Sequence, residues 1–143
     1  MLNAYNFYII AHKLYNYKLP FLSKIVKLFI FLVYNCSIPF EAKIDKGTKF
    51  AYGGISVIIH KRVIIGKNCS IGSNVTIGGR SSFKGVPVIG DNVMIGTGAK
   101  VLGPIKIGDN VKIGANAVVL NDLPNNSTAV GVPAKIIKHE NIN

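Results

Sequence analysis

The 143-residue chain has only two cysteines, six acidic residues and no long uncharged apolar run. Cys36 and Cys69 show neither a CxxC nor a Cys/His spacing, which argues against a disulfide-stabilised secreted scaffold and against a structural zinc site. We therefore expect a reducing, cytoplasmic environment. The length predicts about one domain. With 49% hydrophobic and 16% charged residues, the chain is expected to fold rather than to be disordered.

The shortage of acidic residues leaves a strong positive charge. Seventeen Lys and Arg residues give a net charge of +11, which would attract phosphates, anionic lipid or nucleic acid. The lysines are scattered singly rather than clustered with interleaved aromatic residues, so nucleic acid is not an expected partner. A solvated basic surface is the alternative explanation of the charge.

Residues 1–36 differ from the rest of the chain. They are rich in aromatic and aliphatic residues, they include lysines, and the first acidic residue of the chain is Glu41. Pro20 divides the segment into two stretches of helical length, and the second should end at 35–39, because a proline disfavours helix in the residue before it. We predict two short helices.

The second of these stretches, residues 21–34, is too short and too charged to span a bilayer. It contains Lys24 and Lys27, whereas a spanning helix needs about 20 apolar residues. Residues 1–10 carry no charge and no cleavage site follows, so an export signal is disfavoured. Two interpretations stay open: a helical cap on the next domain, or a basic amphipathic anchor at the inner face of the membrane.

A six-residue period runs through the following part of the chain. Aliphatic residues recur at spacings of six or twelve, and all but one of them are followed directly by glycine, the exception being Val101 before Leu102. The residues of this column are Ile65, Ile71, Ile77, Ile89, Ile95, Val101, Ile107 and Ile113. Most are followed four places later by a small or β-branched residue.

This period predicts an all-β fold, a parallel β-helix of stacked coils over residues 37–137 with a tail at 138–143. A short strand and a glycine-permitted turn every six residues build one side of a coil, and three sides close a turn. We expect one aliphatic side chain per side to point inward and stack on its neighbours. The period is interrupted at 51–60 and at 80–87, where functional groups can project.

These repeats resemble the hexapeptide-repeat acetyltransferases, specifically the serine acetyltransferase branch, and the resemblance implies that the coil is a left-handed parallel β-helix. The resemblance rests on VTIGG at 75–79, on VIGDNVMIGTGAKVLGPIKIGDNVKIGANAVVL at 88–120 and on AVGVPAKII at 129–137. It implies a homotrimer, with acetyl-CoA in the groove between neighbouring subunits and transfer of its acetyl group to a hydroxyl or amino acceptor.

The same resemblance implies positions for the acyl donor. Small residues are expected along the pantetheine arm, and a basic residue near the phosphates. The matching positions are Gly78, Gly79, Ala99 and Ala117 for the arm, and Lys135 for the phosphates. Glycine and alanine at these positions are also what packing between coils requires.

The acceptor-handling residues of serine acetyltransferases are not kept. An Asp-His pair is replaced by Ala51 and Tyr52, a further Asp falls near Ser37, and an Arg-His-Pro is replaced by Gly-Val-Pro at 85–87. The amino and carboxylate groups of serine thereby lose their expected partners. The stretch FAYGGISVIIHK at 50–61 is closer to polysaccharide-biosynthesis acetyltransferases of the colanic acid type. We therefore expect a sugar or glycan acceptor, with serine as the alternative.

The chemistry needs a base with a pKa of about 6 to 7, which histidine supplies, and donors for the oxyanion. Of the three histidines, only His60 lies in the coil, since His12 falls in the helical segment and His139 in the tail. His60 is therefore the candidate catalytic residue, and an exposed turn residue is the alternative role. Tyr52, with the backbone of Gly53 and Gly54, is a candidate for shaping the acceptor pocket.

Two other functions are compatible with the pattern. A metal-dependent carbonic anhydrase would need three histidines at a subunit interface, and the spacing of these three does not suit that site, so no metal is expected. A non-catalytic acetyl-CoA-binding or membrane-tethered subunit would keep the coil without the acceptor residues.

Overall fold

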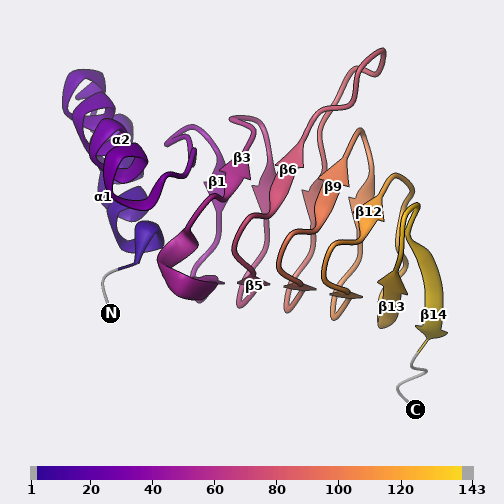
Figure 1. Cartoon of the computed structure of the whole chain (residues 1–143). Coiled ribbons are helices and arrows are strands. Elements are labelled where there is room, and N and C mark those ends of the chain that lie inside the picture. Colours follow the sequence, from indigo (N-terminus) through magenta and orange to yellow (C-terminus); the bar gives the residue numbers. More distant parts are fainter. Residues whose placement is uncertain (1–2, 140–143) are drawn as a thin grey trace.

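The computed structural model describes residues 3–139. Two helices at one end are followed by a parallel β-helix whose coils stack in a row toward the C-terminus (Figure 1). The fold is the parallel β-helix that the six-residue period predicts, and it matches the left-handed class that the resemblance implies.

The two predicted helices are present, and proline and asparagine residues set their ends. Helix α1 spans Ala4–Asn16, and the Asn3 side chain before it accepts a hydrogen bond from the Tyr5 N–H, as an N-cap does. Helix α2 spans Pro20–Tyr34 and ends at Asn35 in the left-handed conformation. Within residues 3–139, neither helix is long and apolar enough to cross a bilayer.

Helix α1 caps the first coil. The Tyr8 hydroxyl donates to the Ala42 carbonyl at 2.6 Å and accepts from the Ile44 N–H, while the Tyr5 hydroxyl donates to the Asp45 carbonyl at 2.8 Å. Tyr8 is fully buried and belongs to the same hydrophobic core as the coil. Helix α1 is therefore packed on the first coil and shares its core.

The coil is made of three sheets of very short strands. The first sheet contains β1 (Lys43–Ile44), β4 (Ile64–Ile65), β7 (Val88–Ile89) and β10 (Lys106–Ile107). The second contains β2 (Lys49–Phe50), β5 (Ser70–Ile71), β8 (Met94–Ile95), β11 (Lys112–Ile113), β13 (Ser127–Val130) and β14 (Lys135–His139). The third contains β3 (Ile58–Ile59), β6 (Thr76–Gly78), β9 (Lys100–Leu102) and β12 (Val118–Val119). Neighbours pair in parallel except β13 and β14.

The predicted aliphatic column forms the core, but each side of the coil contributes two inward side chains rather than one. All eight residues of the column are at most 3% exposed, and the residue two places before each strand's buried member is buried as well. Val75 before Ile77 and Val111 before Ile113 are examples. The expectation of a single inward side chain was wrong because residues two places apart on an extended segment point to the same face, and each side of the coil is long enough between its turns to hold two of them.

Glycine serves a different purpose from the one predicted. The glycines that directly follow residues of the aliphatic column do not adopt positive φ; a Cβ on Gly66 would lie 2.6 Å from the Gly90 carbonyl oxygen of the next coil. Gly47 and Gly98 hold two of the left-handed corners, but most are held by asparagines, with φ between 55° and 60°. These corner residues are Asn68, Asn74, Asn92, Asn110, Asn116 and Asn126. The glycines allow close approach of coils, and the asparagines turn the chain.

Both predicted interruptions leave the regular coil. Residues Ala51–Gly54 form a 3₁₀ turn (η1) between β2 and β3, in which Tyr52 and Gly53 have positive φ. The loop over residues 80–87, which follows β6, projects beyond the rows of turns (Figure 1).

Candidate functional site

At one corner, which follows the strands of the third sheet, most coils do not have the glycine that follows the aliphatic residue elsewhere. These strands place Pro39, His60, Gly78 and Leu102 at equivalent positions of successive coils. The corresponding corner of the first sheet holds Gly66, Gly90 and Gly108 in three consecutive coils. Because only Gly78 lacks a side chain at this corner, the surface there is uneven and offers chemical groups that the rest of the coil does not.

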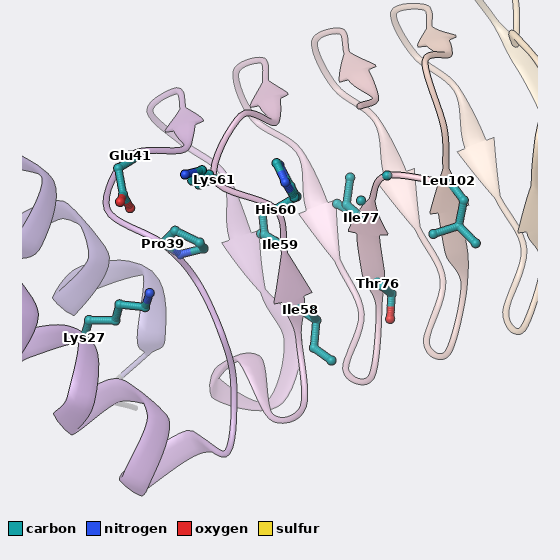
Figure 2. Close-up of a pocket in the computed structure, with 12 residues that line it drawn as sticks. Lys27, Pro39, Glu41, Ile58, Ile59, His60, Lys61, Thr76, Ile77 and Leu102 are labelled. Carbon is teal, nitrogen blue, oxygen red and sulfur yellow. The ribbon is translucent and has the colours of Figure 1, made fainter. Parts of the chain in front are cut away.

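A groove of about 460 Å³ runs along this corner, between the third sheet and α2. Figure 2 shows Lys27 reaching in from α2, Glu41 and Pro39 from the segment entering the coil, and Leu102 at the other end. The remaining lining residues are Ile58, Ile59, His60, Lys61, Thr76, Ile77, Gly78 and Gly79. The groove therefore combines an apolar wall with one imidazole, one carboxylate and two ammonium groups.

His60 lies in the middle of this groove, where β3 ends. Its backbone N–H donates to the Ile77 carbonyl, which fixes the chain, and its Nδ1 accepts a hydrogen bond of 3.1 Å from the Arg62 N–H. A neutral ring held in this way carries its proton on Nε2. A Cβ added to Gly78 would meet only the Cβ of His60, at 3.8 Å, which is an ordinary van der Waals contact.

Two predicted donor-binding residues line the groove with His60. A Cβ added to Gly79 would meet only the Gly85 carbonyl oxygen, at 3.7 Å, and Gly78 is similarly open. Ala99 and Ala117, in contrast, are fully buried in the core. Their N–H and C=O groups also make hydrogen bonds within the coil, to Gly96 and Thr76 for Ala99. The structure thus brings together the two glycines and His60, and not the alanines.

The other predicted residues lie elsewhere on the molecule. Tyr52 is 70% exposed, and Gly53 and Gly54 are buried in η1 beside α1, at a different corner of the coil from His60. Lys135 is exposed on β14, at the far end of the coil (Figure 1). Within one chain, neither the η1 residues nor Lys135 line the groove.

The two cysteines are not candidates for a nucleophile. Both are buried, and burial raises the pKa of the Cys36 thiol to about 11. Burial likewise raises the pKa of the Cys69 thiol. Each thiol therefore stays protonated near neutral pH, where the reactive thiolate is required.

Neither do the described residues gather a metal site. Over residues 3–139, no three His, Cys, Asp or Glu side chains come close enough together to hold a metal ion. His12, on α1, instead places Nδ1 2.6 Å from the Phe40 carbonyl oxygen.

Sequence reasoning missed three charged residues of the groove, Lys27, Glu41 and Lys61. They come from a helix, from a connecting segment and from the turn after β3, so no spacing in the sequence joins them. Leu102 could have been predicted as a groove residue, because it stands where glycine follows the other residues of the aliphatic column. Pro39 and His60 stand at the equivalent positions of preceding coils.

Two family profiles match parts of the coil. Residues 87–121 match the family described as bacterial transferase hexapeptide (six repeats), and residues 62–88 match the hexapeptide repeat of succinyl-transferase. No curated protein sequence matches the chain.

Solved structures of serine acetyltransferases superpose closely on the chain. The soybean enzyme complexed with serine is 39% identical at a TM-score of 0.86, over 94% of this chain and 56% of its own. The Neisseria gonorrhoeae enzyme in complex with serine is 34% identical at 0.86, over 94% and 55%. A serine acetyltransferase in complex with CoA is 37% identical at 0.85, over 94% and 55%. The chain spans little more than half the length of these structures.

These similarities correct the expected acceptor. A sugar or glycan was expected because the acceptor-handling side chains of serine acetyltransferases are missing, but the similar structures are serine acetyltransferases, two of them holding serine. The inference failed because it assumed that partners for the acceptor must stand at the same sequence positions. Charged groups enter this groove from other segments.

Proposed function

The chain belongs to the hexapeptide-repeat transferase superfamily, and from that premise we propose that it is a serine O-acetyltransferase that uses acetyl-CoA as the acyl donor. The single observation that carries this proposal is the 34–39% identity, over 94% of the chain, to serine acetyltransferases solved with serine and with CoA. The groove beside His60 gives the reaction a location.

His60 is the residue proposed to move the proton. It takes the proton of the serine hydroxyl as the hydroxyl oxygen attacks the thioester carbonyl carbon, and it returns that proton to the sulfur when the carbon–sulfur bond breaks. Nδ1 of the neutral ring accepts the hydrogen bond from the Arg62 N–H, and Nε2 carries the proton. Nδ1 can accept the serine proton only after its hydrogen bond to the Arg62 N–H has opened. The contact is solvent-exposed, and water can replace it at a cost of about 1 kcal/mol.

Acetyl-CoA is proposed to lie along the same corner of the coil. Gly78 and Gly79 form a strip without side chains that admits the pantetheine arm, and their backbone N–H groups are candidates for holding the oxyanion. A second hollow, lined by Arg80, Phe83 and Asp122 among others, shares Leu102 with the first and continues the path. Ala99, Ala117 and Lys135 stay proposed donor contacts by resemblance alone.

A homotrimer is part of the proposal. Tyr52, Gly53 and Gly54 occupy a different corner from His60, so they can shape the acceptor pocket only if a neighbouring subunit brings that corner to the groove. The proposed acceptor role of these residues thus depends on assembly. The division of the chain into a helical segment at 1–36, an acyltransferase coil at 37–137 and a tail at 138–143 stays part of the proposal.

A cytoplasmic location is proposed, with contact to an anionic membrane surface through α2. Phe21, Leu28 and Leu32 are 73%, 56% and 71% exposed, and the exposed Lys24 lies among them. No acidic residue precedes Glu41, so a two-fold pairing of α2 with a second copy would bring lysines together without carboxylates. Anionic lipid supplies both an apolar layer and the opposite charge.

An acceptor panel tests the proposed function. Release of the CoA thiol from acetyl-CoA is followed with serine, threonine, ethanolamine, a free sugar, or no acceptor. Serine is expected to give the highest kcat/KM. Binding of acetyl-CoA without thiol release on any acceptor would instead support a non-catalytic subunit, and faster turnover of another acceptor would overturn the choice of serine.

A further inference from the structure

Glu41 places a carboxylate in the groove that nothing in the described part of the chain satisfies. Its Oε2 is buried and has no hydrogen-bond partner among residues 3–139, although the residue lines the open groove. A buried carboxylate oxygen without a partner is costly, and native structures nearly always pair such groups. The oxygen itself has almost no exposed surface, so we expect the side chain to turn it into the groove and to receive a donor there when the groove is occupied.

The neighbouring groups indicate what kind of donor fits. Lys27 and Lys61 line the same groove, and Figure 2 shows Glu41 at the end where α2 brings in Lys27. One negative and two positive groups beside an imidazole match a small molecule that carries both an ammonium and a carboxylate. A neutral acceptor would leave the buried oxygen of Glu41 without a partner.

We propose that Glu41 binds the α-ammonium of the amino acid acceptor, with Lys27 and Lys61 facing its carboxylate, while the hydroxyl points to His60. This inference rests on the proposed function and deepens it, because it names the groups that select a zwitterionic acceptor. It also supplies partners for the two charged groups of serine, which lack them at the positions where serine acetyltransferases carry them.

The test compares acceptors with and without an ammonium group. Initial rates are measured with serine and with 3-hydroxypropanoate, which lacks the ammonium, for the wild type, Glu41→Gln and Glu41→Asp. Glu41→Gln is expected to raise the KM for serine by about 10- to 100-fold, the scale of a hydrogen bond to a charged group, and to leave the weak use of 3-hydroxypropanoate unchanged. Glu41→Asp keeps the charge and should recover part of the loss.

Asp45→Asn is the matched control. It removes the same charge four residues along, from an exposed side chain outside the groove, and should change neither KM. Thermal unfolding of each variant at equal protein concentration separates loss of folding from loss of binding, and Glu41→Asp keeps the test usable if Glu41→Gln unfolds.

The outcomes separate this inference from the proposed function. If the wild type does not acetylate serine, the proposed function fails, and this inference with it. If the wild type acetylates serine and Glu41→Gln does so with an unchanged KM, the ammonium site is overturned while the proposed function stands. An equal loss for both acceptors would make Glu41 a structural residue and would also overturn the inference.

Discussion

At the scale of single residues, the chain distinguishes glycines that the fold needs from glycines that the groove needs. The sequence shows only that glycine follows most aliphatic residues of the repeat. In the structure, a Cβ at Gly66 would meet the backbone of the next coil, whereas a Cβ at Gly78 would meet only His60 at 3.8 Å. Sequence spacing could not separate the two, because the difference depends on what occupies the equivalent corner of the neighbouring coil.

This difference predicts opposite behaviour for two alanine substitutions. Gly66→Ala should lower the free energy of unfolding by about 1–3 kcal/mol, since the coils must separate to admit the methyl group. Gly78→Ala should change it by less than about 0.5 kcal/mol and instead weaken acetyl-CoA binding, because the methyl group narrows the groove. Chemical unfolding at one protein concentration and titration with acetyl-CoA measure the two effects. Equal destabilisation by both variants would contradict the distinction.

At the scale of elements, the sequence predicted the two helices, the short strands and the inward aliphatic column, but not which side of each helix faces the protein. Pro20 marks the start of α2, and the six-residue period marks the strands. The second position of each side, held by residues such as Val75 and Ala99, was recognised as small or β-branched but was not predicted to point inward. Its burial follows from the alternation of side chains along each side, which the six-residue period alone does not reveal.

The exposed side of α2 gives the prediction at this scale. The double variant Phe21→Ser with Leu32→Ser should bind vesicles containing phosphatidylglycerol at least about tenfold more weakly than the wild type, because two large apolar side chains no longer enter the lipid. Both side chains are more than 70% exposed, so folding should be retained. Co-sedimentation with the vesicles measures the effect.

Ile137→Ser is the control for this experiment, since it removes a similarly exposed apolar side chain at the other end of the coil. It should bind vesicles as the wild type does. Phosphatidylcholine vesicles and higher salt should weaken the binding of all forms. If the wild type does not bind anionic vesicles, or if the double variant binds them as strongly as the wild type does, the proposed membrane contact of α2 is contradicted.

At the scale of the whole molecule, the sequence predicted the fold class but misjudged the acceptor. In a repeat fold, each short segment of sequence specifies one side of the coil, so the spacing of Ile65 and its equivalents was sufficient to predict the β-helix. The groove is different, because Lys27, Glu41 and His60 come from a helix, a connection and a strand end, and only folding brings them to one place. The absence of the acceptor-handling residues of serine acetyltransferases was therefore taken as evidence against serine, although other segments bring charged side chains to the groove.

The most direct test of the account is the rate at which O-acetylserine forms from acetyl-CoA and serine, measured by mass spectrometry for the wild type and for His60→Asn. The account predicts steady formation by the wild type. It predicts a loss of about 10²-fold or more in kcat for the variant, the scale of a general base, with folding retained. Absence of O-acetylserine with the wild type, or an unchanged rate in His60→Asn, would contradict it.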